Sequence, residues 1–218
     1  MIVSFSGIDS AGKTTQINLL MTYLKENNIG HKMVWSKARG TPGVVLLKEL
    51  VRKDKVMNFE EKSEHRKEVF QNPKKQRLLY IASMLDLCWY WGIYYRILGM
   101  TKKFLICDRY LWDTYVEINE DFTCVNIDKS LLWKMVKVLA PKSKTSFVFI
   151  VPPEVSLERD IKKSGEGIVV DDLELKKSKI DRYLTLINAS CWTNVMDGMK
   201  PIEVLHEEVK GILNLKEI

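Results

Sequence analysis

The chain has 218 residues, with 34 basic and 28 acidic side chains and a formal net charge of +6. Apolar residues make up 46% of it and charged residues 28%, with 11 Gly and 6 Pro. This length and composition exclude a disordered, collagen-like or solenoid protein. They predict an ordinary globular chain with a hydrophobic core, which we expect to form a single domain over residues 1–218.

Several classes of partner are disfavoured by the sequence. The longest apolar stretch, 78–98, contains Asp86 and Arg96, so we interpret it as a buried helix and expect no membrane partner. The first residues lack a basic segment followed by a long apolar run, which excludes a secretory signal and favours the cytoplasm. Basic and acidic residues alternate in the charged segments, so we expect no nucleic acid polymer as a partner.

The cysteines do not indicate a zinc site or a redox motif. There are four of them, widely separated and without a C-x-x-C pair: Cys88, Cys107, Cys124 and Cys191. We expect them to be reduced and mostly buried.

In the first half of the chain, strand-like and helix-like patterns alternate. The apolar run 2–5 predicts a strand that ends at Gly7, and apolar residues at helical spacing then predict a helix that stops at Asn28 and Gly30. We expect a second strand at 31–35, a short helix at 42–51 and a charged, exposed segment at 54–67. Pro73 opens a long helix.

The second half continues the alternation. Strands are predicted at 103–107, 146–151 and 194–196, and helices at 129–139, from Pro152 and Pro153 to 163, at 173–187 and at 201–213. Strands too apolar to have a solvated face predict an α/β fold, with a parallel sheet covered by helices on both faces. Ligands in such folds bind beyond the carboxyl ends of the strands, so Gly7 and Asp108 should converge on one site.

A phosphate-binding loop is the strongest motif. Residues 7–14 match G-x-x-x-x-G-K-[ST] in full, between a predicted strand and a predicted helix. Backbone N–H groups of such a loop surround an anion, Lys13 reaches the outer phosphates, and the Thr14 hydroxyl can bind Mg²⁺. The chain shows no N-K-x-D guanine-recognition motif, which disfavours a GTPase. The predicted ATP-binding residues are Gly7, Ser10, Ala11, Gly12, Lys13, Thr14 and Thr15.

A second motif, together with the phosphate loop, indicates a particular family of nucleotide-binding proteins. The sequence C-D-R-Y at 107–110 follows the third buried strand, and together with GIDSAGKTTQ at the start it resembles the thymidylate kinase family. VPPEVSLERDIKKSGE resembles that family's strand, helix and lid, KIDRYLTL the next helix, and VMDGMKPIEVLHEEV the closing strand and helix. The resemblance implies a P-loop NTPase fold with a five-stranded parallel sheet, a lid at about 159–171, and a homodimer.

The resemblance also implies an activity, the transfer of the γ-phosphoryl group of Mg-ATP to a nucleoside monophosphate, with residue roles to match. Such catalysis consists of positioning and charge neutralisation. Lys13 and Thr14 would bind the phosphates and Mg²⁺, and Asp108 would hold the water shell of the Mg²⁺. Arg109 matches the family's arginine for the acceptor phosphate, and the alternative is a structural ion pair between Asp108 and Arg109. Asp9 stands where the family keeps an acidic residue near the acceptor's sugar and phosphate.

Two further basic regions are implied to contact phosphates. Arg39, in ARGT, matches the family's other arginine for the acceptor phosphate. Ser10 replaces the arginine that some members carry in the phosphate loop, so the charge of the transition state would be met from the lid. The candidates are Arg159, Lys162 and Lys163, and Arg159 and Lys163 are included among the predicted catalytic residues. Taken alone, basic residues at a helix end more often compensate the helix dipole.

The acceptor side departs from the family's pattern. The family reads thymine with an aromatic residue and an arginine on the long helix before D-R-Y, where this chain has Ala82 and Asp86. After D-R-Y it offers Asp113 and Glu117 in place of a small hydroxyl residue and an aromatic. Carboxylates only accept hydrogen bonds, so we hypothesise an acceptor that presents donors, such as a cytosine-like base or a sugar. Equally, Asp86 could be a surface carboxylate, and Asp113 and Glu117 an exposed helix start.

Other interpretations stay open at this stage. The aromatic residues at 89–95 occupy every face of one helix, which favours a helix-to-helix dimer interface, with a wall of the acceptor pocket as the competing use. A kinase of the same fold could use another small-molecule or sugar-phosphate acceptor. A nucleotide-binding subunit without transfer activity is the third interpretation. Retention of Lys13, Thr14, Asp108 and Arg109 argues against the last one.

Overall fold

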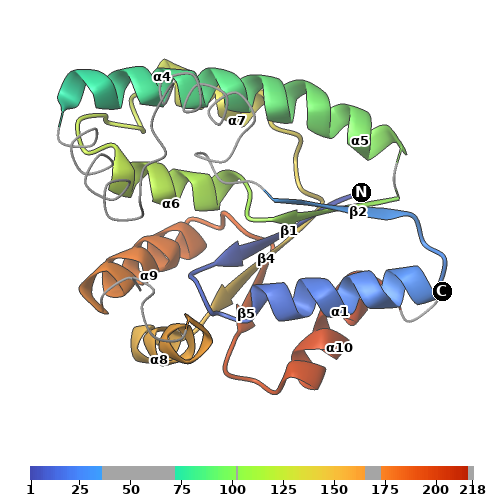
Figure 1. The fold of residues 1–218 in the computed structure, drawn as a ribbon. Coiled ribbons are helices and arrows are strands. Elements are labelled where there is room, and N and C mark those ends of the chain that lie inside the picture. Colours follow the sequence, from blue (N-terminus) through green and yellow to red (C-terminus); the bar gives the residue numbers. More distant parts are fainter. Residues whose placement is uncertain (36–71, 102, 165–172, 216–218) are drawn as a thin grey trace, which may run out of the picture. The chain divides into compact units, whose positions relative to one another are not determined.

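The computed structural model describes residues 1–35, 72–101, 103–164 and 173–215 (Figure 1). Its internal contacts divide the chain into two compact units, which we describe one at a time. Unit 1 comprises Met1–Trp35, Gly99–Asp113 and Lys142–Ile218, and unit 2 comprises Ser36–Leu98 and Thr114–Pro141. The single domain expected over 1–218 stays a prediction.

Unit 1 contains the whole β-sheet. Its five strands are β1 (Ile2–Gly7), β2 (His31–Trp35), β3 (Phe104–Asp108), β4 (Thr145–Ile150) and β5 (Asn194–Asp197). They are all parallel and lie in the order β2-β3-β1-β4-β5. The predicted α/β class with a five-stranded parallel sheet is therefore confirmed. The strand at 31–35 has the expected bounds, and the other four differ from the expected ones by one or two residues at their ends.

The central strands form the core of unit 1. All six residues of β1 and all five of β3 are buried. The ring of Phe5 lies 5.2 Å from that of Phe147 and 6.0 Å from that of Phe149, centroid to centroid, so β1 and β4 also pack through their side chains. Central strands are buried on both faces, so short runs rich in apolar residues were sufficient to locate β1 and β3.

The helices of unit 1 follow the strands in sequence. They are α1 (Lys13–Glu26), α8 (Pro153–Ser164), α9 (Leu173–Asn188) and α10 (Ile202–Ile212). Helix α1 packs against β1, β2 and β3 and against α10, and α8 packs against α9 (Figure 1). Each of these helices was predicted, with ends that differ by one or two residues where the sequence named them.

Unit 2 is helical in its described part. It holds α4 (Pro73–Trp89), a π-helix η1 (Tyr90–Tyr94), α7 (Leu131–Leu139), and most of α5 (Tyr95–Thr101) and α6 (Leu111–Asp121). As expected, Pro73 stands at the start of α4, and the side chain of Asn72 caps the helix by accepting from the N–H groups of Lys74 and Lys75. The π-helix was not predicted.

The long helix of unit 2 is less buried than the sequence suggested. Its inner face contributes Tyr80, Met84, Leu87, Trp91 and Tyr95 to the core. Its outer face carries a row of apolar side chains between 44% and 66% exposed, which we call the apolar stripe: Leu78, Ile81, Leu85, Trp89, Ile93 and Ile97. The prediction of a buried helix at 78–98 is therefore correct for one face only. Of the aromatic residues at 89–95, only Trp89 belongs to the stripe.

Some predicted features fall outside the described residues. These are the short helix at 42–51, the charged segment at 54–67, Arg39, and residues 165–171 of the expected lid. Among the helices that the structure describes, none combines the length and the apolar character that crossing a bilayer requires.

Candidate active site

The phosphate loop, residues 7–14, joins β1 to α1 at the carboxyl edge of the sheet. Its first glycine, Gly7, has a φ of 131°, and a Cβ atom there would lie 2.4 Å from the carbonyl oxygen of Phe149. Gly12, at the N-cap of α1, has a φ of 95°. Both conformations are unfavourable for residues with a side chain, so the two glycines of the motif are required by the shape of the loop.

Lys13 points back into the loop. Its ammonium group donates to the carbonyl oxygens of Gly7, at 2.9 Å, and Ile8, at 2.5 Å, and the residue is only 6% exposed. Burial, together with the positive charge of Arg109, lowers the pKa of Lys13 to about 8. In this arrangement Lys13 is a buried cation held by backbone dipoles, at the place where the motif positions a phosphate.

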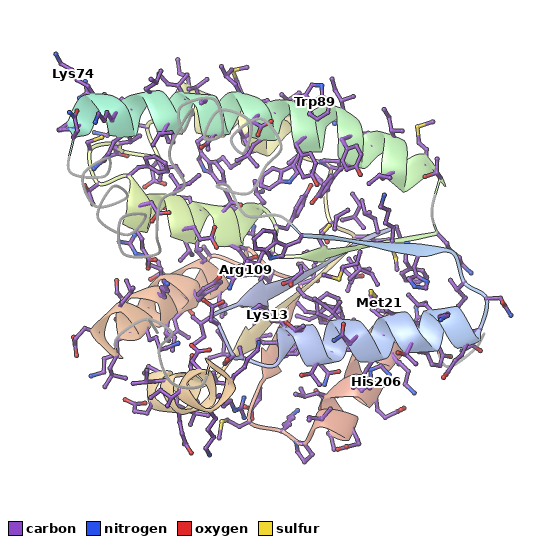
Figure 2. The ribbon with its side chains drawn as sticks, viewed as in Figure 1. Lys13, Met21, Lys74, Trp89, Arg109 and His206 are labelled. Carbon is purple, nitrogen blue, oxygen red and sulfur yellow. The ribbon has the colours of Figure 1, made fainter. Side chains whose placement is uncertain are left out.

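The next strand brings Asp108 and Arg109 to the same place. In the register of β1 and β3, Asp108 lies opposite Phe5, and the backbone N–H of Arg109 donates to the Phe5 carbonyl at 2.9 Å. Figure 2 shows the side chains of Lys13 and Arg109 near these strand ends. Gly7 and Asp108 therefore converge at one edge of the sheet, as the sequence predicted.

Arg109 is held firmly on the loop. Its backbone has a φ of 67°, which is unusual for a residue with a side chain. The guanidinium group donates to the carbonyl of Gly7 at 3.3 Å and forms an ion pair with Asp9, whose side chain is 49% exposed. The structure thus brings together Asp9, Lys13 and Arg109, and their predicted roles in binding and catalysis stay predictions.

Asp113 lies in a buried position that the sequence did not predict. Its side chain is fully buried and lies 3.8 Å from the guanidinium group of Arg109. It accepts hydrogen bonds from the hydroxyl of Ser6, from the N–H groups of Gly7 and Tyr110, both at 3.1 Å, and from the hydroxyl of Tyr183, at 2.7 Å. The interpretation as an exposed helix start is wrong. Since protein donors surround this carboxylate, it ties the phosphate loop to β3 and α9, in place of the acceptor contact expected for it.

Helix α8 contacts the loop from another side. Arg159 donates to the carbonyl oxygens of Gly198, at 3.2 and 3.3 Å, and Ser10, at 3.5 Å. Lys162 forms an exposed ion pair with Glu158, and Lys163 is exposed. Of the three basic candidates from the lid region, Arg159 is therefore the one that the structure places on the phosphate loop.

Four residues that the sequence analysis missed also contact this loop or its neighbours. They are Ser156, Asp160, Lys176 and Tyr183. One signal was present in the sequence: Lys176, Ile180 and Tyr183 lie on one face of the predicted helix, and a lysine on an apolar face needs a buried partner. The partner itself, Asp160, could not be identified from spacing because it lies on a different helix.

Thr14 and Thr15 are exposed in the first turn of α1, and Ala11 is buried. The described residues hold no group of three His, Cys, Asp or Glu side chains that could bind a metal ion by themselves. An oxygen from Thr14 and one from Asp108 suit Mg²⁺, which keeps several waters and is commonly bound through one or two protein ligands and the phosphates of its substrate. The residues present therefore fit this ion.

The remaining acceptor candidates lie elsewhere in the chain. Asp86, on α4, and Glu117, on α6, belong to unit 2 and are partly exposed, as is Ala82. Arg39 lies outside the described residues. Asp9 and Arg109 are therefore in contact with each other in unit 1, whereas Asp86 and Glu117 belong to unit 2.

Comparisons with known proteins identify the family of this chain. The family model described as thymidylate kinase matches residues 5–209. A thymidylate kinase from Plasmodium falciparum is 26% identical, with 98% of this chain and 90% of that protein covered, and one from Fervidobacterium nodosum is 26% identical with 98% of both covered. The crystal structure of an Ehrlichia chaffeensis thymidylate kinase shares the fold, with a TM-score of 0.58, 19% identity and 98% coverage of both chains. This chain therefore belongs to the thymidylate kinase family of nucleoside monophosphate kinases.

Proposed function

We propose that this chain transfers the γ-phosphoryl group of ATP to thymidylate or a closely related nucleoside monophosphate, with Mg²⁺ bound between the outer phosphates. One observation carries the proposal: a complete phosphate loop lies beside Asp108 and Arg109 on the neighbouring strand, in a chain that matches the family model over residues 5–209. The substrates are then nucleotides, with no nucleic acid polymer and no membrane as a partner.

The residues at the sheet edge suit phosphoryl transfer. The loop N–H groups and the start of α1 would hold the ATP phosphates, and Lys13 would turn from the loop carbonyls toward them. Thr14 and Asp108 would hold Mg²⁺, which neutralises charge on the transferred group. Arg109 would bind the acceptor phosphate, and Asp9, its ion-pair partner, orients the guanidinium group at the mouth of the loop.

The second part of the proposal concerns which base the acceptor nucleotide carries. Asp113 is buried and surrounded by protein donors, so Asp86 and Glu117 are left of the three acidic residues at which the chain departs from the family's pattern. A pocket with carboxylates would favour a base that presents hydrogen-bond donors, whereas thymine presents carbonyls. Thymidylate is the first acceptor to test because the relatives are named for it, and a donor-rich acceptor is the alternative.

The experiment is a measurement of ADP release from ATP and Mg²⁺ with each deoxy- and ribonucleoside monophosphate in turn, followed by nucleosides and sugar phosphates. We expect thymidylate to give the highest kcat/KM. A higher value with a cytosine nucleotide or a sugar phosphate would replace the proposed acceptor. Tight ATP binding with no acceptor-stimulated release would instead favour a non-catalytic subunit. Lys13→Ala should abolish transfer while the protein stays folded.

We also propose that the chain forms a homodimer through the apolar stripe on α4, η1 and α5. The stripe has no charged member and runs through about five turns of helix at spacings of three or four residues. A continuous row of this kind suits a second copy of the same helix, since symmetric interfaces pair a surface with itself.

The predicted cytoplasmic location stays a prediction.

A further inference from the structure

A chain of polar contacts connects the phosphate loop to helices α8 and α9. The carboxylate of Asp160, on α8, accepts a hydrogen bond from the Ser10 hydroxyl through one oxygen and forms an ion pair with Lys176, on α9, through the other. All three residues belong to unit 1. A loop residue is therefore fixed by a charged pair that itself spans two helices.

Lys176 is more buried than Ser10 and Asp160. Its side chain is 1% exposed, and its ammonium group donates a second hydrogen bond, of 3.0 Å, to the hydroxyl of Ser156. That hydroxyl donates in turn to the backbone carbonyl of Asp9 at 2.7 Å. One buried cation is thus connected to two consecutive residues of the phosphate loop, to Ser10 through Asp160 and to Asp9 through Ser156.

The loop needs such support at Ser10. This residue has a φ of 55°, a left-handed conformation that costs free energy for a residue with a side chain. Its hydroxyl is bonded to Asp160, and its carbonyl accepts from Arg159 at 3.5 Å. The backbone of the loop binds phosphate only if its N–H groups converge on one point, so holding Ser10 in this conformation prepares the loop for the nucleotide.

We propose that Asp160 and Lys176 are positioning residues for ATP binding, which act through Ser10 and Asp9 and do not touch the nucleotide. Lys176 has two tasks: it orients the carboxylate that holds Ser10, and it neutralises a negative charge that would otherwise stand beside the phosphates. The inference rests on the proposed function in one respect, since ATP is taken as the ligand of the loop.

The charge argument predicts different ATP affinities for the Lys176→Met variant and for the double variant. Lys176→Met leaves the Asp160 carboxylate without its cation beside the anion site, so we expect the ATP dissociation constant to rise by about tenfold, which corresponds to ~1.4 kcal/mol. Asp160→Asn combined with Lys176→Met removes both charges and should recover most of that loss. Lys177→Met is the matched control, since Lys177 lies next in sequence, is 45% exposed and pairs with Glu174 at 3.3 Å.

The test measures Mg-ATP binding by calorimetry and the KM of ATP and of the acceptor separately. We expect the KM of ATP to rise while that of the acceptor stays within about twofold, a split that a general loss of structure would not produce. Unchanged ATP affinity in folded Lys176→Met, or equal changes in both KM values, would overturn the inference. If wild-type protein fails to bind ATP, the proposed function fails instead.

A second variant covers the case in which Lys176→Met does not fold. Ser10→Ala removes only the hydroxyl that Asp160 holds and leaves the buried ion pair intact. We expect it to weaken ATP binding in the same direction as Lys176→Met while the protein stays folded. ATP affinity equal to that of wild type in this variant would contradict the proposal, because Ser10 is the contact through which the pair is expected to act.

Discussion

At the scale of single residues, the pKa of Lys13 links ATP binding to pH. The ammonium group is buried, and its pKa is lowered to about 8. Phosphate oxygens favour the charged form, so ATP binding should raise this pKa and draw a proton from solvent when the pH lies above about 8. We expect ATP affinity to fall as the pH rises above that value, by up to about tenfold per pH unit.

The measurement is calorimetric titration of the protein with Mg-ATP at pH 8.5, about half a unit above the pKa of Lys13, in two buffers with different enthalpies of ionisation. The difference in observed heat gives the number of protons taken up. Wild-type protein should take up a fraction of a proton, and Lys13→Met, which cannot titrate there, should take up none. Equal uptake by both proteins would show that another group is responsible.

Asp113 gives a second prediction at this scale, for stability. Asp113→Ala leaves four donors without an acceptor, from Ser6, Gly7, Tyr110 and Tyr183, and these donors are buried. Buried donors without partners are costly, so we expect the free energy of unfolding to fall by about 3–5 kcal/mol. The measurement is denaturation in urea.

The matched control for Asp113 is Asp128, which accepts one exposed hydrogen bond, from the hydroxyl of Tyr115 at 2.9 Å. Asp128→Ala should change the free energy of unfolding by less than about 1 kcal/mol, because water replaces the lost acceptor. A loss of similar size in the two variants would mean that Asp113 does not organise the loop in the way its contacts indicate.

Site residues could be predicted from the sequence where the backbone conformation requires particular residue types. Gly7, Gly12 and Lys13 were identifiable because a phosphate loop needs these residue types at fixed spacing. Asp113 and Lys176 were not assigned their observed places, since their partners come from strands and helices distant in sequence. A motif specifies local conformation, whereas the pairing of buried charges depends on how the elements pack.

At the scale of elements, the strands were more predictable than some helices. Strands β1, β3 and β4 are short, apolar and buried, and these properties are visible in sequence. The π-helix at Tyr90–Tyr94 was not predicted, because apolar and aromatic residues fill the whole segment and no periodicity marks the additional residue in the turn. The same lack of contrast explains why the sequence does not distinguish the exposed face of this helix from the buried one.

The junction of α4 and α7 offers a prediction for elements. The hydroxyl of Ser130 caps α7 by accepting from the N–H of Trp133 at 3.4 Å, and it also accepts from the hydroxyl of Tyr80, on α4, at 2.6 Å. Ser130→Ala removes both interactions, so we expect the free energy of unfolding to fall by about 2 kcal/mol. Chemical denaturation measures this change.

Asn72→Ala is the matched control, because the side chain of Asn72 caps one helix, α4, and its loss does not remove the contact between α4 and α7. We expect about 1 kcal/mol for this variant. Tyr80→Phe should also cost less than Ser130→Ala, since it leaves the cap of α7 in place. Equal losses in Ser130→Ala and Asn72→Ala would show that the contact between α4 and α7 contributes little to stability.

At the scale of the whole molecule, the apolar stripe argues for assembly. Consecutive members from Ile81 to Ile97 are four residues apart, and in an α-helix such a row rotates by about 40° per step, because four residues exceed one turn. The wider π turn between Tyr90 and Tyr94 offsets part of that rotation. The unusual turn therefore keeps the stripe on one side of the helix, which suits a straight partner helix.

The test is the oligomeric state of Leu85→Glu. Leu85 is 53% exposed in the middle of the stripe, and in a symmetric dimer the substitution places carboxylates in both copies of the interface. We expect sedimentation velocity to give a dimer for wild type and a monomer for this variant, whose folding is checked by circular dichroism. Ile161→Glu, at a site on α8 that is 57% exposed, should stay dimeric. A monomeric wild type, or a Leu85→Glu protein that remains dimeric, would contradict the assignment of the stripe to a second copy.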